Sequence, residues 1–180
     1  SARFIALMRI LDRVAEGGEK VLVFLESLDL QDAEQLPLLL QRRYGLPKSP
    51  MVINGQVSTE VRQQRVNAFQ RDKGFDVMLL SPKAGGVGLT LTAANHVIHL
   101  SRWWNPAVED QCSDRVYRIG QSKPVHIYYP LAVLPGREEH SFDWQLQILM
   151  DRKRKLALNL LSAPAFTHED YQTLVAGVRN

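Results

Sequence analysis

The stretch "DVMLLSPKAGGVGLTLTAANHVIHLS", residues 76–101, contains two short apolar runs separated by a glycine-rich loop. The runs at 76–81 and 96–101 are apolar without polar alternation, which is typical of strands buried on both faces. Such strands occur in parallel sheets, whose faces are covered by the helices that connect the strands. The stretch therefore predicts two strands of a parallel sheet, with a loop at the carboxyl end of the first.

The sequence on both sides alternates in the same way between apolar strand and helix. Further strands are predicted at residues 20–27, 51–54 and 125–132. Helices are predicted at residues 2–16, 30–44, 58–71, 106–118 and 138–161, with one more around 169–178. These elements predict an α/β fold in which a parallel sheet has helices on both faces. The loops at the carboxyl ends of its strands are expected to line one working edge.

The chain is expected to have a main body and an appendage. Its 180 residues are enough for one domain with a substantial core, and 45% of them are hydrophobic. The stretch "LPGREEH", residues 134–140, is the most plausible boundary between the two parts. We therefore predict a core over residues 1–136, and a long helix with a tail over residues 137–180.

Composition narrows the classes of function. The net charge of +3 permits a polyanionic partner without requiring one. Cys112 is the single cysteine, so no internal disulfide can form and a reducing compartment is indicated. No apolar run approaches the ~20 residues of a membrane span, so no membrane partner is expected. The five histidines show no ligand spacing, so no metal site is predicted. The chain begins with Ser1, which suggests a piece of a longer protein.

Three side chains of the predicted helix 106–118 share one face. Gln111, Arg115 and Arg118 are separated by four and three residues. Two guanidiniums and an amide on one face form a donor-rich surface for phosphate oxygens. The alternative is a solvated face on which the arginines pair with Glu109, Asp110 and Asp114. Gly120 ends the helix just after Arg118, which favours an exposed site near the working edge.

Two further features accompany this helix. The loop "AGGVG", residues 84–88, follows a strand and allows a backbone to approach phosphates closely. It is not a G-x-x-x-x-G-K-[ST] loop, and no such motif occurs in the chain; a plain tight turn explains it equally well. Trp103 and Trp104 end a strand, where one ring is expected to be buried and the other offered for stacking. The alternative is that both rings serve packing.

Taken together, "LLSPKAGGVGLTLTAANHVIHLSRWWNPAVEDQCSDRVYRIGQ" resembles motifs V and VI of the Swi/Snf-like DNA translocase family of helicase superfamily 2. The matching positions are Ser81, Ala84, Gly85, Gly86, Gly88, Leu89, Thr90, Leu91, Trp104, Asn105, Pro106, Gln111, Asp114, Arg115, Arg118, Ile119, Gly120 and Gln121. Upstream, residues 20–27 resemble motif IV. The sequence departs from the family pattern at Ser101, Cys112 and Tyr117, which replace an acidic residue, an alanine and a histidine.

The resemblance implies a RecA-like second lobe followed by a brace helix. In this family ATP with Mg²⁺ lies between two lobes, and the first lobe carries the P-loop that holds both. Arg115 and Arg118 are then the arginine fingers, with Gln111 beside them and Gly86 and Gly88 shaping the loop near the nucleotide. The resemblance also implies contacts with the DNA backbone, at Ser81, Lys83, Gly55 and Trp104, with Arg102 beside the tryptophans.

The expected function is that of a second motor lobe in an ATP-dependent translocase on double-stranded DNA. Its partners are double-stranded DNA and the first RecA-like lobe of the same protein, and the chain alone is expected to be inactive as an ATPase because it lacks a P-loop. The double tryptophan resembles bacterial members, which implies the bacterial cytoplasm and its nucleoid. The alternatives are a RecA-like module kept for binding or scaffolding, and a lobe of an RNA helicase.

Overall fold

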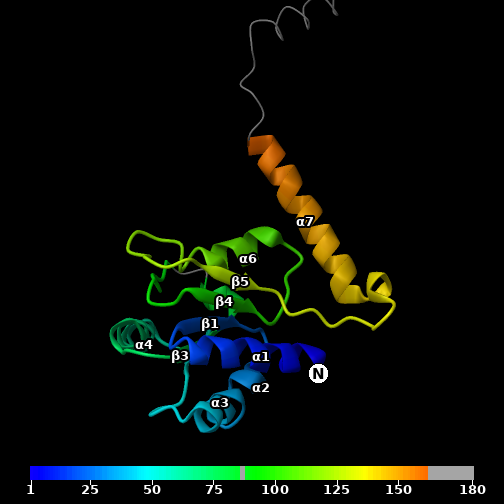
Figure 1. The fold of residues 1–180 in the computed structure, drawn as a ribbon. Helices are drawn as coiled ribbons and strands as arrows, with labels where there is room; N and C mark the ends of the chain where they lie inside the picture. The colour runs from blue at the N-terminus through cyan, green and yellow to red at the C-terminus, as the bar shows by residue number, and fades with distance from the viewer. Residues whose placement is uncertain (86–87, 162–180) are drawn as a thin grey trace, which may run out of the picture.

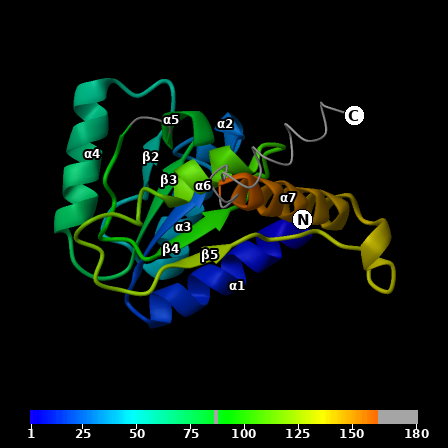
Figure 2. The same ribbon diagram turned by 90° about the horizontal axis from the view of Figure 1, so that it is seen from above.

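The computed structural model describes residues 1–85 and 88–161, and a five-stranded parallel sheet lies at the centre of this part (Figure 1). Its strands are β1 (Lys20–Phe24), β2 (Met51–Ile53), β3 (Asp76–Leu80), β4 (His96–His99) and β5 (His126–Tyr128). The spatial order is β2-β3-β1-β4-β5, so that β2 and β5 form the two edges (Figure 2). The predicted α/β fold with a parallel sheet is confirmed.

Helices cover both faces of the sheet. On one face α1 (Ala2–Glu16) and α3 (Leu36–Tyr44) pack on alternate residues of β1 and β3, and the short α2 (Leu28–Gln31) precedes α3. On the other face lie α4 (Thr59–Arg71), α5 (Pro82–Gly85) and α6 (Pro106–Ser113). Cys112 of α6 belongs to this second core, where burial raises the pKa of its thiol to about 12. The sheet is therefore enclosed, as its apolar strands predict.

Several predicted boundaries are confirmed by local chemistry. Ser58 caps α4, because its Oγ accepts a hydrogen bond from the backbone N–H of Val61. Asn105 caps α6 in the same way, and Pro106 occupies the first turn. The predicted helix 30–44 is divided into α2 and α3. The helix predicted at residues 169–178 lies outside the described residues.

The end of α6 differs from the prediction. The helix stops at Ser113, and residues 114–120 form turns instead of continuing it to Arg118. The carbonyl of Arg115 accepts a hydrogen bond from the N–H of Leu91 at 3.0 Å, and Val116 is completely buried in the core. A hydrogen bond to another segment and a buried valine therefore replace the last turn of the predicted helix.

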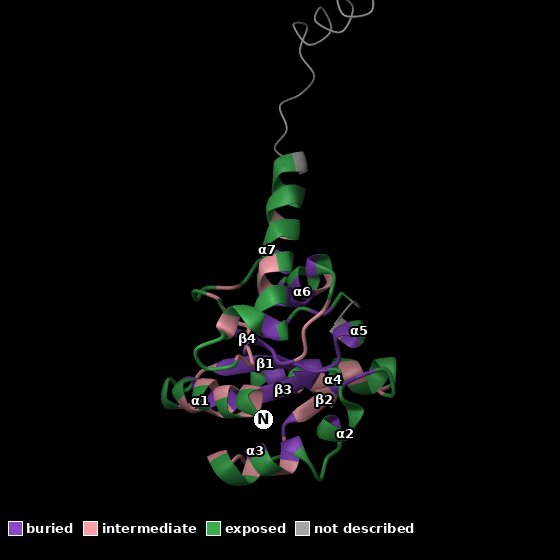
Figure 3. Ribbon diagram, turned by 90° about the vertical axis from the view of Figure 1, so that its right-hand side faces the viewer, coloured by how far each residue is buried: buried purple, intermediate pink, exposed green. Residues whose placement is uncertain are grey.

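The appendage is a 20-residue helix, α7 (Phe142–Leu161), preceded by a short 3₁₀ turn, η1 (Glu138–His140). Its first half packs on the lobe through Leu146 and Met150, while its second half extends away from the sheet (Figures 1 and 3). Leu149 and Leu156 of α7 are exposed. Ile148 is half-buried, and the side chain of Leu160 lies outside the described residues. Within residues 1–85 and 88–161, no helix is long and apolar enough to cross a membrane.

A buried carboxylate joins α6 to α7. The side chain of Glu109 is 0% exposed and binds two arginines, Arg102 at 2.8 Å and Arg154 of α7 at 3.0 Å. Arg102 is itself 2% exposed in its side chain and also donates to Gln147 Oε1 of α7 at 2.7 Å. Both guanidiniums lie over the ring of Tyr129, at 4.5 and 5.5 Å from its centre. This cluster, formed by Arg102, Glu109, Tyr129 and Arg154, is called the joint cluster below.

We predict that Glu109→Ala lowers the free energy of unfolding by about 3–5 kcal/mol, because it leaves the buried Arg102 without its carboxylate. The matched control is Asp110→Ala on the same helix. Asp110 is 51% exposed and pairs with Arg154 only at the surface, so its loss costs less than about 1 kcal/mol. Urea denaturation measures both values. Equal losses for the two variants would contradict the buried role of Glu109.

A second prediction concerns His99, which stacks between Phe24 and Tyr129 with ring centres 5.4 and 5.1 Å away. Burial lowers its pKa to about 4; the nearby Glu109 carboxylate opposes this shift, while the charges of Arg102 and Arg154 add to it. Because the ordinary pKa is about 6.5, the fold favours the neutral ring. This stability is complete above pH ~6.5 and is lost as the pH falls towards the folded pKa.

Between pH 7 and pH 4 we expect His99 to account for about 3 kcal/mol of lost stability. Urea midpoints across this range measure the loss, and His99→Gln should remove that part of the pH dependence. His140→Gln serves as control, because His140 is 71% exposed in its side chain. An unchanged pH dependence in His99→Gln would show that other groups cause the acid sensitivity.

Candidate functional site

The loops that follow β1, β2, β3 and β4 meet at one edge of the sheet, since all strands are parallel. Hydrogen bonds tie these loops together. Ser101 Oγ accepts from the N–H of Glu26 at 3.0 Å, which joins the loops after β4 and β1. Asn54 donates to Gln31 Oε1 at 3.1 Å, and Gln31 donates to the carbonyl of Leu25 at 2.8 Å. This working edge is thus a connected surface.

Arg115 is buried, with 3% of its surface exposed, and its Nε has no hydrogen-bond acceptor in the described part of the chain. Burial lowers the pKa of Arg115, and the nearby charge of Arg118 lowers it further. A guanidinium keeps its charge in proteins. A buried and unpaired charge is costly, so this position is suited to an anion brought from outside.

Arg118 is exposed and reaches the glycine loop. Its Nη1 donates to Thr90 Oγ1 at 3.2 Å and to the carbonyl of Gly88 at 3.4 Å. Gln111 is exposed on α6. The expectation that Gln111, Arg115 and Arg118 share one helix face is wrong, because α6 ends before either arginine. The turns nevertheless keep the two arginines near one another, since the charge of Arg118 lowers the pKa of Arg115. Gly86 lies outside the described residues.

One glutamine fixes the segment that carries the arginines. The Nε2 of Gln121 lies 2.7 Å from the carbonyl of Ala94, 3.2 Å from that of Thr92 and 3.3 Å from that of Val116. Gln121 therefore fastens the turns after α6 to the loop before β4. From the sequence, Gln121 matches a motif but receives no role in the site. The backbone carbonyls that it contacts come together only in the folded chain.

The residues expected to contact DNA do not all have the same surroundings. Lys83 and Gly55 are exposed. Ser81 is mostly buried, and its Oγ accepts from the N–H of Ala84 at 3.2 Å, which begins α5. Arg102 differs from the expectation, because its guanidinium is buried in the joint cluster. The alternative in which Glu109 is a solvated partner of Arg115 and Arg118 is wrong for this residue. Glu109 is buried and binds Arg102 and Arg154 instead.

The two tryptophans are divided as predicted. Trp103 is half-buried, while Trp104 is 60% exposed. The ring of Trp104 meets Phe142 of α7 edge to face, with ring centres 5.7 Å apart. Its exposed face borders a groove on α7 that includes Leu146, Leu149 and Arg152. Trp104 therefore has both a packing contact and a free surface.

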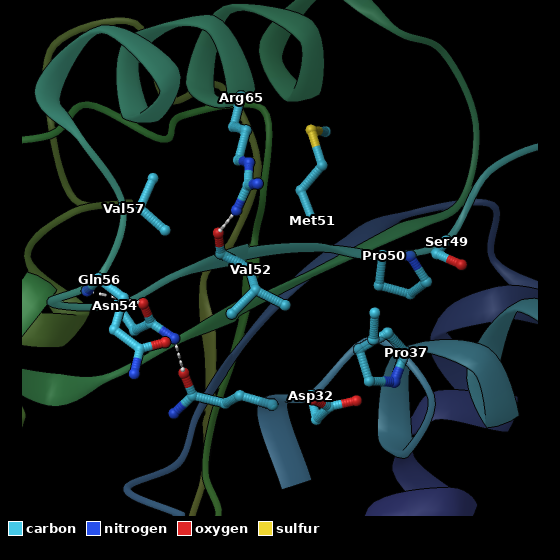
Figure 4. A pocket seen from close by; sticks show the side chains of 12 residues that line it. Asp32, Pro37, Ser49, Pro50, Met51, Val52, Asn54, Gln56, Val57 and Arg65 are labelled. Carbon is cyan, nitrogen blue, oxygen red and sulfur yellow. Dashed lines mark hydrogen bonds between the residues drawn. The ribbon is translucent and has the colours of Figure 1, made fainter. Parts of the chain in front are cut away.

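A separate pocket of about 500 Å³ lies beside β2, between α3 and α4 (Figure 4). Asn54 and Gln56 line one side of it, and Asp32 and Pro37 line the other. Arg65 donates to the carbonyl of Val52, so a side chain occupies this exposed edge of the sheet. No residue of the segment 111–121 lines the pocket. Among the described residues, no group of three His, Cys, Asp or Glu side chains is placed to hold a metal ion.

Comparison with known proteins shows the family. Residues 2–120 match the family described as the helicase conserved C-terminal domain. The chain is 40% identical over 165 residues to Zorya protein ZorD of Escherichia coli, covering 88% of the chain and 15% of that protein. It is 39% identical over 147 residues to the putative ATP-dependent helicase/translocase YwqA of Bacillus subtilis, covering 82% of the chain and 15% of that protein.

Solved structures agree with these sequence relatives. The Sulfolobus solfataricus SWI2/SNF2 ATPase core in complex with double-stranded DNA is similar with a TM-score of 0.66 and 29% identity, covering 87% of this chain and 30% of that one. A second structure, described as the Sulfolobus solfataricus SWI2/SNF2 ATPase core domain, is similar with a TM-score of 0.67 and 29% identity. It covers 91% of this chain and 31% of that one. The chain thus spans about a seventh of the curated relatives and about a third of these solved cores. This chain belongs to the helicase conserved C-terminal domain family, as the RecA-like C-terminal lobe of a Swi/Snf-like ATPase.

Proposed function

We propose that this lobe supplies Arg115 and Arg118 to an ATP molecule held on a second lobe, and that it contacts the backbone of double-stranded DNA as part of a translocase. The observation that carries the proposal is the buried guanidinium of Arg115, whose Nε has no acceptor within the described residues. A triphosphate would give this charge the anionic partner that it lacks among the described residues. A scaffold has no need of such a group.

The two arginines are placed for different contributions. Arg115 is buried and fixed through its carbonyl to Leu91, so its position is set before any ligand arrives. Arg118 is exposed and bound only weakly to Thr90 and Gly88, so it can exchange these acceptors for phosphate oxygens. Positive charge on the transferred phosphoryl group stabilises the transition state, and an arginine finger contributes ~10³–10⁵ in rate.

Because the arginines act on ATP held by a second lobe, hydrolysis is linked to movement of the two lobes. The chain has no G-x-x-x-x-G-K-[ST] motif, so ATP and Mg²⁺ are expected to be held mainly by the other lobe. Hydrolysis then requires the two lobes to close, and we expect little ATPase activity from this chain alone. Closing and opening with each ATP moves the DNA contacts of one lobe relative to those of the other. YwqA and the SWI2/SNF2 core bound to double-stranded DNA support this class of activity.

In the full-length protein, Arg115→Met and Arg118→Ala should each lower DNA-stimulated kcat at least ~10³-fold. Arg137→Ala, which removes an exposed arginine outside the site, is the control and should leave kcat unchanged. Because Arg115 is buried and its Nε has no acceptor in residues 1–85 and 88–161, Arg115→Met should also raise the free energy of unfolding by about 1 kcal/mol. Steady-state ATP turnover and urea denaturation measure the two effects. Full turnover in either variant would contradict the proposed role of the arginine that it replaces.

The DNA contacts are tested by salt titration of binding to double-stranded DNA. Lys83→Ala should weaken binding and reduce the slope of log affinity against log salt by about 1. Lys123→Ala is the matched control, since Lys123 pairs with Glu19 at the amino end of the sheet, opposite the working edge.

Trp104→Ala should weaken binding with little change in slope, because it removes a ring and no charge. Equal affinity would leave Trp104 with only its contact to Phe142. Tighter binding to RNA would favour the RNA helicase alternative.

A further inference from the structure

The segment that carries the arginines also exposes apolar side chains. Val116 is buried in the core, but the next residues point outward: Tyr117 is 54% exposed and Ile119 is completely exposed, at 104%. Gly120 has φ +104°, a conformation that glycine favours, and it turns the chain back towards Gln121. Ile119 has the highest exposure among the large hydrophobic side chains of the described residues.

This exposure is not a sign of a loosely held loop. Gln121 fastens the segment to two backbone carbonyls outside it, those of Thr92 and Ala94. Within the segment, the Gln121 N–H donates to the carbonyl of Arg118 at 3.0 Å. The N–H of Leu91 holds the other end through the carbonyl of Arg115. The segment is therefore fixed to the lobe at both ends, while the side chain of Ile119 is left uncovered by the part of the chain that the structure describes. A single exposed apolar residue is ordinary; one fixed directly beside Arg118 is placed where the ligand of that arginine must approach.

We infer that Tyr117 and Ile119 form a docking surface for the P-loop lobe of the same full-length protein. The inference rests on the proposed function: a lobe that brings phosphates to Arg118 must also cover Ile119, its immediate neighbour in the chain. A further lobe that could cover Ile119 is consistent with the length of the relatives and solved cores, which extend far beyond this chain. DNA is a poorer occupant, since an aliphatic side chain offers nothing to a phosphate backbone.

The surface makes closure of the lobes more favourable without touching ATP. Burying a fully exposed isoleucine favours the closed state, in which the arginines can act. Arg118 then contributes charge and Ile119 contributes apolar contact from adjacent positions. Ile119 is thus a positioning residue, and its effect should depend on side-chain shape and hydrophobicity.

The test uses four variants of the full-length protein and measures DNA-stimulated ATP turnover. Ile119→Ser should lower kcat/KM for ATP about tenfold, since it removes most of the apolar contact. Ile119→Leu should restore at least half of the activity. Leu134→Ser, a change at an exposed leucine outside the segment, should leave activity unchanged. The melting temperature of Ile119→Ser should stay within about 2 °C, because Ile119 is fully exposed in the lobe.

Arg118→Ala separates this inference from the proposed function. If Arg118→Ala is impaired and Ile119→Ser stays within twofold of the unchanged protein, the docking surface is overturned and the arginine site stands. If neither variant is impaired, both proposals fall.

A photo-cross-linking amino acid at position 119 identifies the occupant directly. With DNA and a non-hydrolysable ATP analogue present, peptides of the P-loop lobe should be cross-linked, and fewer should be found without nucleotide. Cross-linking to DNA, or to a second copy of the protein, would overturn the inference.

Discussion

β1 pairs in parallel with β3 on one side and with β4 on the other, and this central pairing decides where every functional loop lies. Parallel neighbours cannot be joined by a short hairpin, so the chain must cross a face of the sheet between strands. All carboxyl ends then meet at one edge. The glycine loop after β3 and the tryptophan segment after β4 are brought to this edge from opposite sides of β1. The turns that follow α6 are joined instead to the loop that leads into β4, through the hydrogen bond between Leu91 and Arg115.

The lobe contains two arginines, Arg102 and Arg115, with buried side chains and different hydrogen bonding. Arg102 is buried with a carboxylate, an amide and an aromatic ring around it, so its hydrogen-bonding capacity is used within the protein. Arg115 is equally buried, yet its Nε has no partner among the described residues. Sequence position alone places both near the same motifs. Only the surroundings show that the first fastens α7 and that the second has an Nε without an acceptor in the part of the chain that the structure describes.

Much of the fold could be predicted because its strands are strongly apolar and its helix starts carry capping residues such as Ser58. The end of α6 could not, because the spacing of Gln111, Arg115 and Arg118 also fits a helix and the competing hydrogen bond comes from a residue 24 positions away. The role of Arg102 was missed for a related reason: its partners lie on α6 and α7, far apart in the sequence. Motif matching predicted the two arginines as a pair, but their unequal burial is a property of the folded chain.

The burial of Cys112 has a practical consequence for studying motion. A thiol reacts as its thiolate, and a pKa of about 12 keeps Cys112 protonated at neutral pH, while the core around it excludes reagents. Cys112 is the only cysteine of the 180 residues. A cysteine introduced on the surface of this lobe is therefore the one thiol in it that a maleimide dye can label. These 180 residues therefore already provide a background for labelling this lobe with a fluorescent dye, with no need to replace a core residue.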